Sequence, residues 1–269
     1  MNEPKPGMEF ELRRHPEKSG TELKTPSGEK TPLPKEGIQQ AQAEGKKFAD
    51  RIKEIPKAVV FGFTSNVPRT QEAGYIWSEE LRYMAKQLPD SRVFDLQKEG
   101  SLDQIASQVD DSVDKVIVIN SPAHTGLGGR KWNMEAVQTR TKELGGEPNA
   151  LRKWMVDPEL QQEFGVTPEQ IAQETRSWIQ EQQDTATRLF PGRPVIITGI
   201  GHAFELDTAI AALMGKEFAE STVDEMGGKL INTMEGARIV IDETGKGAVE
   251  YRDMKADLDL GEEAGERKE

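Results

Sequence analysis

Hydrophobic residues recur along this chain at two spacings, and the two spacings alternate from one segment to the next. Met8, Phe10 and Leu12 alternate with glutamates, which predicts a strand with one apolar face. Residues 58–64 (AVVFGFT) and 115–120 (KVIVIN) are short, continuous apolar runs, typical of strands that are buried on both faces. Further strands are predicted at residues 92–96, 194–199, 237–242 and 248–252.

Helical spacing occupies most of the chain between these runs. In residues 35–52 the apolar positions recur as on one face of a helix. Two helix starts carry capping-box pairs, Ser101 with Gln104 and Thr167 with Gln170. The predicted helices are residues 35–52, 69–88, a helix after Ser101, 133–144, two short pieces around Trp154 and Phe164, 167–190 and 203–214.

Alternation of strands and helices predicts an α/β fold, a three-layer α/β/α sandwich with a mainly parallel sheet. A length of 269 residues fits one such domain, which we assign to residues 1–253, with residues 121–166 as a helical insertion or cap. Residues 254–269 carry six acidic and three basic side chains. Because they lack apolar periodicity, we expect a disordered acidic tail there.

Composition narrows the classes of function. The formal net charge of -12 disfavours nucleic acid as a partner, since phosphate backbones bind basic surfaces. The chain has no cysteine, which excludes thiol catalysis and Cys-ligated metal sites. No apolar run is long enough to span a bilayer and no signal-peptide pattern opens the chain, so we expect a cytoplasmic protein without a membrane partner. Oligomeric state stays undetermined.

Two of the three histidines follow predicted strands. His15, with Arg14 before it, comes just after the first strand, and His202 follows residues 194–199. Arg69 opens the helix after residues 58–64. The carboxyl ends of parallel strands meet at one edge of a sheet, where ligands bind, so these side chains are expected to meet there.

Phosphoryl transfer suits this set of residues. A neutral imidazole can attack phosphorus, and arginine donates paired hydrogen bonds to phosphoryl oxygens while keeping its charge. The loop at residues 13–36 holds six basic and four acidic side chains, which favours an anionic ligand. The three histidines lack metal-ligand spacing.

Other polar residues near these strands are expected to be structural. His124 lies in a glycine-rich stretch, residues 121–129, that matches neither a P-loop nor a dinucleotide motif, although the same sheet edge could put it at the mouth of a substrate site. Glu205 and Asp207 follow His202 in the next helix, and we interpret them as structural carboxylates.

Taken in order, these motifs resemble the histidine phosphatase superfamily, which includes phosphoglycerate mutases. Its members carry Arg-His-Gly after the first strand, and here Arg14-His15-Pro16 stands in that place. The resemblance covers most of residues 8–88 and 168–252. Further matches to the family pattern are Leu33, Gly37, Gln40 and Ala41 on the first helix, Ser65, Arg69 and Ala73 at a strand-to-helix turn, and the run from Ile197 to His202.

The resemblance implies a phosphoglycerate mutase-like fold and a phosphatase that hydrolyses a phosphate monoester through a phosphohistidine. His15 would accept the phosphoryl group; Arg14, Arg69 and His202 would hold it; no metal or organic cofactor would be needed. The substrate would be a small phosphate ester or a phosphorylated protein. For the proton donor we choose Glu99, with Asp95 as the alternative, because the family has a glutamate after the corresponding strand.

Two alternatives stay open. A phosphomutase of the same family would pass the phosphoryl group to a second hydroxyl. A catalytically inactive module would bind a phosphorylated ligand without turnover, and Pro16 bears on this choice because proline has no N–H to offer an oxyanion.

Overall fold

The computed structural model describes residues 7–16, 23–24, 30–31, 33–65, 67–119, 132–242 and 244–260. Eight strands form one sheet in the order β10-β9-β8-β1-β7-β4-β6-β5. The strands of this sheet are β1 (Met8–Arg14), β4 (Val59–Thr64), β5 (Ser91–Asp95), β6 (Lys115–Ile119), β7 (Val195–Gly201), β8 (Gly236–Ile241), β9 (Lys246–Tyr251) and β10 (Met254–Asp259). A separate two-stranded sheet pairs β2 (Leu23–Lys24) with β3 (Lys30–Thr31).

The helices lie close to the predicted positions. They are α1 (Lys35–Lys53), α2 (Pro68–Ala85), α3 (Leu96–Glu99), α4 (Leu102–Ala106), α5 (Met134–Glu143), α6 (Glu147–Val156), α7 (Pro158–Phe164), α8 (Pro168–Leu189), α9 (Ala203–Leu213) and α10 (Thr222–Glu225). The capping box at Thr167 and Gln170 is complete, and the hydroxyl of Ser101 accepts from the backbone N–H of Gln104. No helix of the described ranges is both long and apolar enough to cross a membrane.

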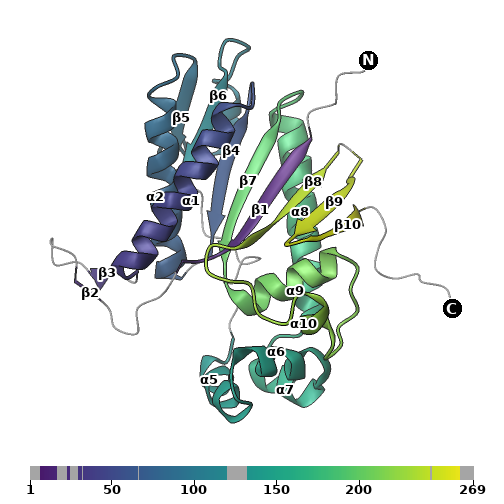
Figure 1. The fold of residues 1–269 in the computed structure, drawn as a ribbon. Coiled ribbons are helices and arrows are strands. Elements are labelled where there is room, and N and C mark those ends of the chain that lie inside the picture. The colour runs from purple at the N-terminus through teal and green to yellow at the C-terminus, as the bar shows by residue number, and fades with distance from the viewer. Residues whose placement is uncertain are drawn as a thin grey trace.

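The predicted α/β class, with a mainly parallel sheet, is confirmed. β1, β7, β4, β6 and β5 run parallel, and β8, β9 and β10 add an antiparallel edge beyond β1. Figure 1 shows α1 and α2 in front of the parallel strands, α8 behind the sheet, and α5, α6 and α7 grouped beneath its lower end. These three helices form the helical cap, in the part of the chain predicted as an insertion.

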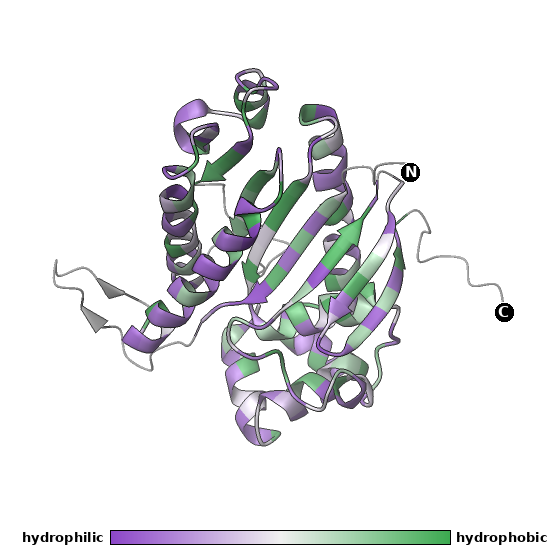
Figure 2. Cartoon of the chain, turned by 45° about the horizontal axis from the view of Figure 1, so that its top comes forward, coloured by the Kyte–Doolittle hydropathy of each residue, from purple (hydrophilic) through white to green (hydrophobic). Residues whose placement is uncertain are grey.

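Two apolar cores hold the layers together. One lies between the sheet and the pair α1 and α2, and includes Phe48 and Trp77, whose rings stack with centroids 5.0 Å apart. The other joins the opposite face of the sheet to α8, α9 and the cap, and includes Phe10 and Trp178. In Figure 2 the green, hydrophobic segments concentrate along the strands while purple ones mark the outer sides of the helices.

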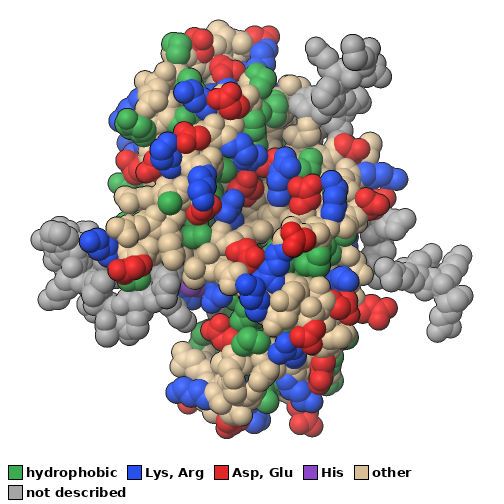
Figure 3. Space-filling model, viewed as in Figure 1, with side chains coloured by type: hydrophobic (Ala, Val, Ile, Leu, Met, Phe, Trp, Pro, Cys, Tyr) green, Lys and Arg blue, Asp and Glu red, His purple; other side chains and the backbone are tan. Residues whose placement is uncertain are grey.

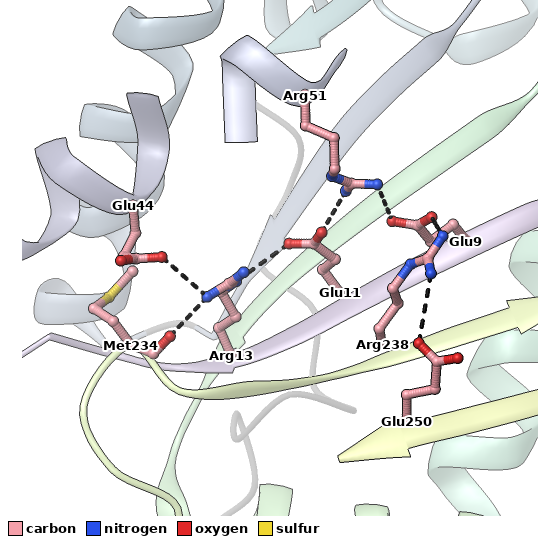
Figure 4. Close-up of polar contacts among 8 residues, drawn as sticks. All are labelled: Glu9, Glu11, Arg13, Glu44, Arg51, Met234, Arg238 and Glu250. Carbon is pink, nitrogen blue, oxygen red and sulfur yellow. Dashed lines mark hydrogen bonds and ion pairs between the residues drawn. The ribbon is translucent and has the colours of Figure 1, made fainter. Parts of the chain in front are cut away.

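A row of charged side chains ties β1 to its neighbours (Figure 4). Glu9 and Glu11 project from the same face of β1 and are buried, with 8% and 6% exposed. The guanidinium of Arg51, from α1, contacts both carboxylates, at 2.6 Å from Glu9 Oε1 and in a close contact with Glu11. Arg238 of β8 and Arg13 of β1 complete the row, at 2.7 Å from Glu9 and 3.2 Å from Glu11. This ion-pair row holds the strand that leads to His15.

The prediction of a disordered tail was wrong for residues 254–259, the first six of that segment. Met254–Asp259 forms β10, which pairs antiparallel with β9 along its whole length. The segment does alternate: Met254, Ala256 and Leu258 are less exposed than the residues between them, and Leu258 is buried. Its charged side chains face solvent and stay hydrated. They therefore do not oppose the backbone hydrogen bonds to β9 that form the strand. Residues 261–269 lie outside the described part of the chain.

Charges of both signs are mixed on one face of the molecule (Figure 3). On the face shown in Figure 3, Lys and Arg side chains are interspersed with Asp and Glu over the helices and the sheet edge.

Candidate active site

Three adjacent strand ends bring distant segments of the chain together. The backbone N–H of His15, just past β1, donates to the carbonyl of Gly201 at the end of β7, at 3.0 Å. The N–H of Ser65, just past β4, donates to Ile200 on the other side of β7, at 3.3 Å. His202 follows β7, and its ring lies 5.2 Å from the ring of His15, centroid to centroid. The two histidines therefore meet at the carboxyl edge of the sheet.

The ring of His15 is buried and held by its own neighbour. Its Nδ1 lies 2.6 Å from the carbonyl oxygen of Pro16. A carbonyl oxygen only accepts hydrogen bonds, so Nδ1 carries the proton and the lone pair of the neutral ring is on Nε2. Proline lacks an N–H but keeps its carbonyl, so Pro16 supplies the contact that orients this ring.

The ring of His202 is held from both sides. Arg69 Nη2 lies 2.9 Å from Nδ1, and because a guanidinium only donates, Nδ1 accepts. Nε2 then carries the proton and donates to the hydroxyl of Ser65 at 3.0 Å. This assignment gives a neutral His202 whose Nδ1 edge faces Arg69.

A short chain of hydroxyls continues from His202 into the protein. Ser65 Oγ lies 2.7 Å from Thr70 Oγ1, and Thr70 Oγ1 donates to the carbonyl of Val67 at 2.8 Å. Ser65 and Thr70 are fully buried. Each hydroxyl in this chain accepts from one neighbour and donates to the next, so the proton on His202 Nε2 has a fixed acceptor.

Two arginines border the histidines. Arg14 donates from Nη1 to the carbonyl of Ile231 at 2.7 Å, and its Nη2 lies 3.6 Å from a carboxylate oxygen of Glu147. Burial lowers the pKa of Arg69, and the charge of Arg14 lowers it further, while Glu147 opposes the change. Charges that influence one another this way lie near each other, so Arg14, Arg69 and Glu147 lie close together at this edge of the sheet, here called the candidate pocket.

Each of the two arginines has a buried N–H donor without an acceptor among the described residues. The Nε atoms of Arg14 and Arg69 are buried and have no hydrogen-bond partner among the described residues. A buried cationic donor without a partner is costly, which favours an anion in the space between them. Guanidinium groups repel metal ions, so this donor set fits an oxyanion and gives a cation no ligands.

The structure brings together four of the five site residues predicted from the sequence: Arg14, His15, Arg69 and His202. It does not bring Glu99 to them. β5, which leads to Glu99, lies four strand positions from β1, or roughly 19 Å at about 4.8 Å per position.

Local contacts also occupy both proposed proton donors. Glu99 accepts from Gln108 at 3.0 Å. Asp95, the alternative, caps α3 through the backbone N–H of Gln97. His124 lies outside the described residues.

Sequence reasoning missed Glu147, Thr70 and Ile231. Glu147 opens α6 in the cap, 133 residues beyond Arg14, and no motif connects them. Thr70 carries a recognisable signal, since a hydroxyl in the first turn of a helix commonly bonds a nearby backbone carbonyl.

Comparisons with known proteins identify similar folds. No family model matches the chain, and no curated protein matches it in sequence. Among solved structures, "Mycobacterial hydrolase 1" is 14% identical, with a TM-score of 0.48 over 93% of this chain and 100% of that one. A mycobacterial glucosyl-3-phosphoglycerate phosphatase is 12% identical, with a TM-score of 0.46 over 93% and 99%. A phosphoserine phosphatase from Entamoeba histolytica is 15% identical, with a TM-score of 0.38 over 86% and 90%.

Proposed function

We propose that the protein hydrolyses phosphate monoesters through a covalent phosphohistidine at His15. One arrangement carries the proposal. The rings of His15 and His202 lie 5.2 Å apart at the carboxyl edge of the sheet, and the buried Nε donors of Arg14 and Arg69 have no hydrogen-bond partner among the described residues. A nucleophile with an oriented lone pair and cationic donors for the phosphoryl oxygens are the groups that this reaction needs.

The first step forms a P–N bond and breaks a P–O bond. His15 Nε2 attacks phosphorus while Nδ1–H remains bonded to the carbonyl of Pro16. Arg14 and Arg69 hold the phosphoryl oxygens, and His202 lies beside them. The leaving oxygen takes a proton from an acid. In the second step water attacks phosphorus, gives its proton to the same group, and His15 is released with inorganic phosphate.

Glu147 is the acid we propose for these two steps. The sequence favoured Glu99, but Glu99 lies on the far side of the parallel strands and is bonded to Gln108. Glu147 lies 3.6 Å from Arg14 and interacts electrostatically with Arg69. A carboxyl group beside the arginines that hold the phosphoryl group would lie near the leaving oxygen and near the water that replaces it.

One contact bears on the alternatives. The carbonyl of Pro16 performs the contact that orients His15, so loss of an N–H at this position does not itself argue for an inactive binding module.

The direct test is to trap the intermediate. The protein is mixed with p-nitrophenyl phosphate, quenched in alkali because phosphoramidates hydrolyse in acid, digested and examined by mass spectrometry. We expect a phosphoryl adduct on His15 and release of inorganic phosphate, both abolished by His15→Ala. Phosphate binding without adduct or release would favour the binding module, and transfer of the adduct to an added alcohol would favour the mutase.

The acid is tested through the leaving group. p-Nitrophenolate leaves without a proton, whereas an alkyl leaving group needs one. Glu147→Gln should therefore slow single-turnover formation of the phosphohistidine from glycerol phosphate by about 100-fold, and its formation from p-nitrophenyl phosphate far less. Glu99→Gln is the matched control and should change neither rate. Equal losses on both substrates would rule out proton donation by Glu147.

A further inference from the structure

The guanidinium of Arg14 is bonded to a loop that follows α10. The loop is residues 226–235, here called the carbonyl loop. Its residue Ile231 accepts from Arg14 Nη1 at 2.7 Å. The backbone of Arg14 is bound there as well, since its N–H donates to Glu235 and its carbonyl accepts from Met234. The direction of the remaining donors of Arg14 therefore depends on where Ile231 lies.

Asp207 holds Ile231 from the other side. Its two carboxylate oxygens lie 3.0 and 3.2 Å from the backbone nitrogen of Ile231. Asp207 is 4% exposed, and Ile231 is fully buried. A chain of hydrogen bonds thus runs from Asp207 through the N–H and then the carbonyl of one residue to the guanidinium of Arg14.

Asp207 lies on the helix that also carries the second histidine. His202 is the N-cap residue of α9, and Asp207 follows it five residues later. One rigid element therefore supports both sides of the pocket, His202 directly and Arg14 through Ile231. A change in the position of α9 would move both together.

A second arginine secures the rest of the carbonyl loop. Arg252 donates to the carbonyls of Met226, Lys229 and Leu230, and pairs with Glu235 at 2.9 Å. These contacts hold the loop in place and involve no atom of the Arg14 guanidinium or of Ile231. The loop therefore has two supports, of which only Asp207 bonds the residue that accepts from the guanidinium of Arg14.

Burying a carboxylate costs free energy, and among the described residues Asp207 accepts only one N–H hydrogen bond in return. Burial raises the pKa of Asp207 to about 7, against the opposing influence of the Ile231 hydrogen bond, Arg252 and Arg14, with Glu235 acting in the same direction as burial. Tyr251, packed nearby, is the remaining titratable neighbour. An apolar residue at this position would avoid the cost but would leave the N–H of Ile231 without its acceptor.

We propose that Asp207 is a positioning residue for phosphate-ester binding: through Ile231 it sets the guanidinium of Arg14, which makes the contact with the phosphoryl group. This inference deepens the proposed function and rests on the assignment of Arg14 to the phosphate pocket. The sequence alone suggested a purely structural carboxylate here.

The experiment compares three variants by two readouts. Binding of inorganic phosphate is measured by calorimetry, which needs no turnover, and KM and kcat are measured with p-nitrophenyl phosphate. Asp207→Ala removes the acceptor of Ile231 N–H and should raise both Kd and KM by about tenfold, the value of one well-placed charged hydrogen bond, with a smaller change in kcat. Asp207→Asn keeps an acceptor oxygen and should restore both constants to within about threefold of the unaltered protein.

Glu235→Gln is the matched control. It weakens the support of the carbonyl loop by Arg252, so it should lower Tm while leaving Kd and KM unchanged. Asp207→Ala with unaltered Kd, or Glu235→Gln with the same loss of affinity, would overturn the inference. Phosphate binding without hydrolysis by the unaltered protein would contradict the proposed function alone, and the Kd values would still decide the role of Asp207. Absence of phosphate binding would overturn both.

Discussion

His202 and Ser65 are 137 residues apart in the sequence, and the hydrogen bond between the imidazole Nε2 and the serine hydroxyl is 3.0 Å long. Arg69 only donates, so the proton of His202 is on Nε2, and the bond to Ser65 holds the ring with its Nδ1 edge facing Arg69. It connects the helix turn after β4 to the end of β7, two elements that supply one side of the candidate pocket.

We predict that Ser65→Ala lowers kcat for p-nitrophenyl phosphate by about tenfold, because the Nε2–H of His202 loses its acceptor and the ring is then held from one side only. Ser78→Ala is the control, since that hydroxyl lies on α2, the helix that follows Ser65, and bonds the carbonyl of Gly74 instead. Steady-state kinetics with both variants checks the prediction. Equal rates for Ser65→Ala and Ser78→Ala would show that the hydrogen bond from His202 to Ser65 does not matter for catalysis.

Pro16 leads to a second prediction. Its carbonyl binds His15 Nδ1, and glycine offers the same carbonyl with a less restricted backbone. Pro16→Gly should therefore change kcat by no more than about threefold, in either direction. A large gain in activity would mean that the backbone N–H that Pro16 lacks limits catalysis. It would then support the hypothesis that the unaltered protein is an inactive binding module.

The sequence predicted the fold and much of the site for a clear physical reason. Continuous apolar runs such as residues 115–120 are found in strands covered on both faces, and residues that follow parallel strands meet at one edge. His15 and His202 follow β1 and β7, which are neighbours in the sheet. The rule puts both residues at the same edge, and the adjacency of the two strands brings their rings near each other.

The same rule could not place Glu99 or Glu147. Position after a strand says which edge a residue occupies but not how far along that edge it lies, and the order of strands places β5 four positions from β1. Glu147 belongs to a cap whose packing depends on tertiary contacts, among them the stacking of Trp154 on Phe204. Contacts of this kind leave no periodic signal in the sequence.

A third prediction concerns the ion-pair row along β1. Arg51→Met should destabilise the protein by about 2–3 kcal/mol, because Glu9 and Glu11 would stay buried without the guanidinium that contacts both, and the partial exposure of Arg51 moderates the loss. Urea unfolding followed by circular dichroism measures the change. Lys46→Ala removes an exposed pair with Asp50 and should leave the unfolding midpoint almost unchanged. Similar midpoints for the two variants would refute a stabilising role for the row.

The last prediction is the pH dependence of stability that Asp207 causes. Burial raises its pKa from 3.8 to about 7 in the folded protein, so the folded state binds a proton that the unfolded state has already released between these values. Its contribution to stability is therefore complete below pH 3.8 and is lost as the pH rises to about 7. Between pH 5 and pH 7 the loss amounts to roughly 2–3 kcal/mol, or about 5 °C in Tm.

Asparagine does not titrate, so the difference in Tm between Asp207→Asn and the unaltered protein should rise in favour of the variant by about 5 °C between pH 5 and pH 8. Comparing the two proteins at each pH cancels the titration of all other groups. Asp253→Asn, at an exposed position, should show the same Tm difference at both pH values. If the Tm difference between Asp207→Asn and the unaltered protein were also the same at both pH values, Asp207 would be ionised throughout this range. The charges of Arg14 and Arg252 would then compensate for its burial.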